Sequence, residues 1–173
     1  DFAWFASPEF IVQYDTVQLQ TKIVDVFAFY RPKHLSTWKF ANTYTKDGLK
    51  HYSNWIGEYA YNTATTVCGI ANDFSGGMEY PSITLITTQG GGKELDETIV
   101  HEIGHNWFYG VLASNEREHA WMDEGMNTYY QKRYMDEKYK NSSPIEKTGK
   151  AFIDNRIPDD MEKLVIKSLK GIQ

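Results

Sequence analysis

Residues 100–109 read Val-His-Glu-Ile-Gly-His-Asn-Trp-Phe-Tyr, and this segment is the most informative part of the chain. Residues four apart on an α-helix lie on one face, one turn above each other. His101 and His105 can therefore direct two imidazoles at one metal ion. Glu102 lies on an adjacent face, where its carboxylate can hold a water molecule beside that metal. The spacing predicts a metal-binding helix over about residues 94–109 and is typical of a zinc site.

The opposite face of this predicted helix is apolar. A stripe of large side chains recurs every four residues: Leu95, Ile99, Ile103 and Trp107. At about 100° per residue, the two histidines point nearly away from this stripe. We therefore expect the helix to pack on one side and to present its histidines on the other.

A catalytic zinc usually takes three protein ligands and leaves a fourth position open. Candidates for the third ligand lie downstream, at Glu116, Glu118, Asp123 and Glu124, with His119 as a minor alternative. We favour Glu124, because it opens a predicted helix over about residues 123–139 among apolar neighbours, where an unpaired carboxylate would be costly. Asp123 and Asn127 are candidates for orienting the histidines, although Asp123 fits a plain helix-start role equally well.

These residue types support hydrolysis. One Zn²⁺ held by His101, His105 and Glu124 would lower the pKa of a bound water to roughly 7. Glu102 is then the expected general base, which accepts a proton from the attacking water and passes it to the leaving amine. Peptide hydrolysis is the leading hypothesis from the motif.

The rest of the chain predicts an α/β domain. β-Branched and aromatic runs predict strands over about residues 1–6, 9–14, 18–30, 65–71 and 83–86. A long helix is expected from Pro32 to about Tyr59, bent or interrupted at Asp47-Gly48. Further helices are expected to open at Pro144 and near Asp159.

Composition excludes several classes of partner. The chain has 173 residues, 41% hydrophobic content and a net charge of −5 without a basic patch, which argues against nucleic acid. No stretch approaches the roughly 20 apolar residues that a membrane-spanning helix needs. The lone Cys68 cannot form an internal disulfide, and its apolar surroundings indicate a small buried side chain. Compartment and oligomeric state are not predicted.

Three segments together resemble one family. Residues 100–108, the segment Trp121-Met122-Asp123-Glu124-Gly125-Met126 and the segment Gly76-Gly77-Met78-Glu79-Tyr80 resemble, in order and spacing, motifs of the gluzincin aminopeptidases, the aminopeptidase N and leukotriene hydrolase group. The 18 residues between His105 and Glu124 (106–123) also match that group. The resemblance implies a thermolysin-like catalytic domain with a small mixed sheet and helices, and the removal of amino-terminal residues from peptides.

The resemblance also implies substrate-binding roles. Glu79 would hold the free α-amine of the peptide, and the backbone of Gly76, Gly77 and Met78 would run beside it like an edge strand. This chain departs from the family at two of these positions. Tyr80 stands where Asn is usual, which puts the amine pocket in doubt. Gly77 stands where Ala is usual, and we expect this change to matter little.

The family comparison further implies that residues 1–173 are the central catalytic domain of a longer chain, with an amino-terminal β-domain and a carboxy-terminal helical part outside it. The family's transition-state tyrosine would lie beyond Gln173, so we expect the isolated piece to bind zinc but to be weakly active or inactive. Two alternatives remain open: a zinc endopeptidase with the same chemistry, and a non-catalytic interaction domain that retains the fold.

Overall fold

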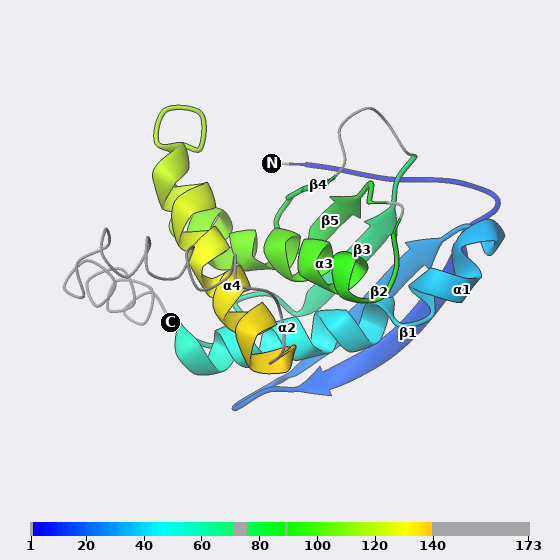
Figure 1. Cartoon of the computed structure of the whole chain (residues 1–173), viewed down its shortest axis with the longest axis horizontal. Coiled ribbons are helices and arrows are strands. Elements are labelled where there is room, and N and C mark those ends of the chain that lie inside the picture. The colour runs from blue at the N-terminus through cyan, green and yellow to red at the C-terminus, as the bar shows by residue number, and fades with distance from the viewer. Residues whose placement is uncertain (1, 71–75, 89, 140–173) are drawn as a thin grey trace.

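A five-stranded mixed sheet, in the order β1-β2-β3-β5-β4, carries the main helices on one face (Figure 1). The computed structural model describes residues 2–70, 76–88 and 90–139. The α/β class expected from the sequence is therefore confirmed. None of the helices in these described residues combines the length and the apolar character that crossing a bilayer requires.

The sheet begins with a hairpin and ends in a short edge strand. β1 (Ile11–Gln18) and β2 (Ile23–Tyr30) are antiparallel, whereas β2, β3 (Thr63–Cys68) and β5 (Ile83–Ile86) run parallel to one another. β4 (Gly77–Met78) pairs antiparallel with β5 at the edge. The single strand expected over 18–30 is wrong, because a turn closed by Leu19 and Lys22 separates β1 from β2. Residues 2–6 form no strand either.

The first helical segment breaks at a place the sequence did not indicate. α1 (Leu35–Trp38) ends before α2 (Ala41–Trp55), and α2 continues without interruption through Asp47-Gly48. A Cβ at Gly48 would lie 2.7 Å from Cγ2 of Val100 on the neighbouring helix. The glycine therefore permits close helix packing, and the interruption predicted at Asp47-Gly48 is wrong.

The helix predicted to bind metal is α3 (Lys93–His105), which continues as a π-helical turn over Asn106–Val111. Every member of its predicted apolar stripe is buried, as expected: Leu95, Ile99, Ile103 and Trp107. α2 packs along α3 on the sheet, and α4 (Met126–Lys138) packs against both helices. A second π-helical turn, Trp121–Gly125, leads into α4. The helices expected after Pro144 and near Asp159 lie outside the described residues.

A buried charge holds α4 to α3. Asp96 is completely buried and accepts hydrogen bonds from the hydroxyls of Tyr134 (2.8 Å) and Tyr139 (2.6 Å). The ammonium of Lys138 lies 2.7 Å from the same carboxylate. Because a buried carboxylate is tolerated only with such partners, this contact defines how the two helices are placed relative to each other.

Candidate metal centre and active site

The two histidines of α3 come together as their spacing predicts. Their rings lie edge to face with centroids 4.8 Å apart, and their Nε2 atoms are 3.2 Å apart. Two nitrogens bound tetrahedrally at about 2.0–2.1 Å from one zinc ion lie roughly 3.3 Å from each other. The separation of the two Nε2 atoms in this chain therefore fits a shared metal.

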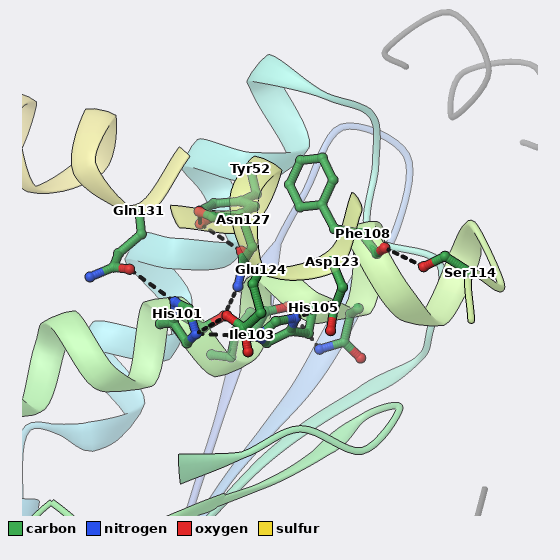
Figure 2. A network of polar contacts seen from close by, with 11 residues as sticks. Tyr52, His101, Ile103, His105, Phe108, Ser114, Asp123, Glu124, Asn127 and Gln131 are labelled. Carbon is green, nitrogen blue, oxygen red and sulfur yellow. Dashed lines mark hydrogen bonds and ion pairs between the residues drawn. The ribbon is translucent and has the colours of Figure 1, made fainter. Parts of the chain in front are cut away.

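Glu124 reaches the same point from the turn that precedes α4 (Figure 2). Its Oε2 lies 3.2 Å from Nε2 of His101 and 3.9 Å from Nε2 of His105. Two nitrogens and one carboxylate oxygen form a ligand set that zinc accepts, and the half-exposed Glu124 leaves one side of the group accessible to solvent. The other acidic candidates, Glu116 and Glu118, belong to none of the described groups with metal-ligand spacing.

The second ring nitrogen of each histidine, Nδ1, also has a hydrogen-bond partner. Nδ1 of His105 bonds to Asp123, and both side chains are almost completely buried. Nδ1 of His101 donates to Oε1 of Gln131 over 2.9 Å. Partners at Nδ1 leave Nε2 of each ring directed at the ligand position. The sequence suggested Asp123 for this role but missed Gln131, whose signal is its place on α4 two turns after Glu124.

Asn127 acts on the backbone of α3 rather than on a ring, in contrast to the orienting role considered from the sequence. Its Nδ2 donates to the carbonyl of His101 (2.7 Å), and its Oδ1 accepts from the hydroxyl of Tyr52 (3.2 Å) (Figure 2). A Cβ at Gly104 would lie 1.9 Å from that Oδ1. Gly104 is therefore needed for α3 to approach α4 at the height of the histidines.

Glu102 is only 4% exposed, and its Oε2 finds no hydrogen-bond partner among the described residues. Burial raises the pKa of Glu102 to about 7, even though the charges of His101 and His105 act in the opposite direction. A carboxylate buried without a partner is costly in a site that serves only to hold the fold together. It is suited to a site that exchanges protons with a bound molecule.

The neighbouring acids raise the pKa values of both histidines. Burial lowers the pKa of His101, but the hydrogen bond with Glu124 and the charge of Glu102 outweigh it and raise the pKa to about 9. The same balance, with Asp123 as the bonded acid, raises the pKa of His105. The hydrogen bond with His101 lowers the pKa of Glu124. An excess of negative charge at the site thus favours a cation in its centre.

The edge of the sheet crosses this site. A Cβ at Gly77 on β4 would lie 2.5 Å from the carboxyl carbon of Glu102, so the strand passes directly over that side chain. Glu79 follows β4, and its carboxylate lies within 4.8 Å of ligand atoms of Glu102 and His105. Burial is the main cause of its raised pKa. The structure thus brings Gly77 to Glu102, and Glu79 to Glu102 and His105, although both precede α3 in the chain.

A mixed sheet beside a helix that carries two histidines and a buried glutamate defines the thermolysin-like class of metallopeptidase domain. Within that class, residues 40–168 match the Peptidase family M1 domain, about three quarters of the chain, and the chain belongs to this family.

Its relatives are much longer proteins. The chain is 33% identical over 70 residues to leucine aminopeptidase 2-1 of Meyerozyma guilliermondii, a match that covers 39% of this chain and 11% of that protein. It is 37% identical over 60 residues to human aminopeptidase B (34% and 9%), and 29% identical over 100 residues to leukotriene A-4 hydrolase of Xenopus laevis (57% and 16%). Each match therefore spans less than a fifth of the relative.

Solved structures share the fold. An M1 zinc metallopeptidase from Deinococcus radiodurans superposes with a TM-score of 0.64 at 18% identity, over 87% of this chain and 34% of that one. A native yeast LTA4 hydrolase gives a TM-score of 0.54 at 20% identity, over 71% and 20%. At these identities the likeness concerns the fold alone.

Proposed function

We propose that this chain is the zinc-binding catalytic domain of an aminopeptidase, an enzyme that removes amino-terminal residues from peptides. One observation carries the proposal. Nε2 of His101, Nε2 of His105 and Oε2 of Glu124 converge beside the buried, unpartnered Oε2 of Glu102. Family membership and relatives named as aminopeptidases support the same activity. Because the chain covers little of those relatives, the activity is proposed for the complete protein that contains it.

When bound, the proposed zinc would supply Lewis acidity, which would polarise the scissile carbonyl and lower the pKa of nearby water. His101, His105 and Glu124 would hold it, with Gln131 and Asp123 keeping the rings oriented. The pKa of Glu102, about 7, suits a group that must both accept and return a proton near neutral pH.

In the proposed reaction Glu102 transfers the proton, and residues of β4 together with Glu79 position the peptide. Glu102 takes a proton from water while the water oxygen bonds to the carbonyl carbon. When the carbon–nitrogen bond breaks, Glu102 returns this proton to the departing amine, so that one water is consumed for each bond cleaved. Gly77 and Met78 can align the peptide along the free edge of β4, and Glu79 can bind its amino group.

Two substitutions in the full-length protein test the proposal. Glu102→Gln should keep stoichiometric zinc and abolish hydrolysis, because it keeps the shape but removes the base. Glu79→Ala should impair cleavage of peptides with a free amine more than that of amino-blocked peptides. Equal loss on both substrates, or preferred cleavage of blocked peptides by the parent protein, would instead support an endopeptidase. A protein that holds no zinc would support the interaction-domain alternative.

A further inference from the structure

The cleft beside the metal site has two acidic residues that the proposed reaction does not use. It has a volume of about 430 Å³, enough for a bound side chain, and its lining includes four carboxylates: Glu94, Glu97, Glu102 and Glu124. No lysine or arginine occurs among the described residues that line it. Glu102 and Glu124 have the roles proposed above, whereas Glu94 and Glu97 do not.

Glu97 and Glu94 line the cleft from α3, one and two turns before His101 respectively. Nε2 of Gln131 donates to Oε1 of Glu97 over 2.8 Å. Gly90 leaves room for Glu94, since a Cβ there would lie 1.9 Å from Oε2 of Glu94. The adjacent Lys93 places its ammonium 5.6 Å from the ring centroid of Tyr139 and does not line the cleft.

An acid near a helix start complements the helix dipole and needs no ligand to explain it. The cleft offers a second observation that points to a ligand. Glu102 is 96% buried, lines this cleft, and has an oxygen without a hydrogen-bond partner among the described residues. A cleft that contains a buried acceptor without a partner can bind a molecule that has hydrogen-bond donors.

The direction of a bound peptide follows from the edge strand, and this step depends on the proposed function. Glu79, the proposed amine site, lies near His105, Glu102 and Glu124 but is not itself part of the cleft lining, whereas Gly76 and Gly77 are. A peptide that places its amino group at Glu79 and runs along β4 therefore passes Gly77 toward Gly76. The residue after the cleaved bond then enters the cleft beside Glu94 and Glu97.

We propose that Glu94 and Glu97 form a subsite that selects lysine or arginine immediately after the cleaved bond. A cationic side chain there meets two carboxylates, whereas an acidic side chain is repelled by both. The preference concerns the second residue of the substrate and is independent of which amino-terminal residue is removed.

The test uses the zinc-loaded full-length protein and three tripeptides, Leu-Lys-Ala, Leu-Gln-Ala and Leu-Glu-Ala. The expected order of kcat/KM is Lys, then Gln, then Glu, with about a tenfold ratio of Lys to Glu, since each partly exposed carboxylate acts with the strength of a surface ion pair. The ratio should fall as salt is added. Dissociation constants of the same peptides, measured by calorimetry on the Glu102→Gln variant, should show the same order without turnover.

Glu94→Gln should lower the Lys-to-Glu ratio, and Glu94→Lys should reverse it. Glu137→Gln is the matched control, because Glu137 is exposed on α4, pairs with Arg133 and lies outside the cleft lining; its ratio should equal that of the parent. Three peptides cleaved and bound equally well, or a ratio unchanged in Glu94→Gln, would overturn the subsite. If no free-amine peptide is cleaved at all, the proposed function fails instead, and the calorimetric order then decides on the subsite separately.

Discussion

Asp123 bonds to Nδ1 of His105, and both side chains are almost fully withdrawn from solvent, with 3% and 1% of their surface exposed. The residue next to Asp123 in the chain, Glu124, approaches the other nitrogen of the same ring. Two consecutive acids thus act on one imidazole from opposite sides. One orients the ring and the other shares the proposed metal with it.

Asp123→Ala should weaken zinc binding by about 10–100-fold, the usual cost of losing a partner that orients a ligand. Asp123→Asn should lose less, because an amide oxygen can still accept the Nδ1 proton. Competition with a chromogenic chelator measures both affinities. Equal affinities for the parent and the alanine variant would show that Asp123 does not support the site.

Gly77→Ala should reduce turnover without loss of zinc. The new methyl group would lie 2.5 Å from the carboxyl carbon of Glu102 and would push the proposed base out of position. Complete misplacement would cost the contribution of a general base, about 10²–10⁴-fold in kcat. The family comparison predicts instead that this position matters little, and the kcat of the variant distinguishes the two expectations.

Gly125→Ala is the control for that prediction, because a Cβ at Gly125 meets no atom within 4 Å. Its kcat and zinc content should match those of the parent. A Gly77→Ala protein with normal kcat would mean that Glu102 moves aside without consequence.

Tyr134→Phe should lower the free energy of unfolding by about 1–3 kcal/mol, because it removes a hydrogen-bond donor from a buried carboxylate. That donor is the hydroxyl 2.8 Å from Asp96. Tyr14→Phe is the matched control, since its hydroxyl bonds to Asp25 at the surface and should contribute little. Urea denaturation measures both, and equal losses would contradict the structural role of Asp96.

Zinc should stabilise the protein more as the pH rises. Without metal, the pKa of His101 is raised from 6.5 to about 9 and that of Glu102 from 4.5 to about 7. Both groups hold protons more tightly when folded, so the stability they contribute is lost as pH increases from about 4.5 to 9. The lowered pKa of Glu124 acts only below its ordinary value of 4.5.

Zinc binds the deprotonated ligands, so the stabilisation that zinc gives increases with pH. The stability that the raised pKa values contribute decreases over the same range. The increase in melting temperature that zinc causes should therefore be larger at pH 8.5 than at pH 5.5. A zinc-induced shift of equal size at both pH values would contradict the proton competition at His101.

Local periodicity made part of this molecule predictable. The four-residue spacing that places His101 and His105 on one face also defines the apolar stripe on the other, and both follow from helix geometry alone. Gly48 shows the limit of such reasoning. A glycine inside a helical pattern signals a local break, but here it accommodates Val100 from a helix some 50 residues away in the sequence.

The order of neighbouring residues alone predicted the class of the domain, the helix that carries the histidines, and the chemical types of the proposed ligands and base. The folded structure was needed to show that Gln131 supports His101, that Asn127 holds the backbone of α3, and that Gly77 lies against Glu102. These contacts join residues 25 to 30 positions apart, from different helices or from a strand and a helix. No periodicity encodes them, because they exist only after α3, α4 and the edge of the sheet have packed together.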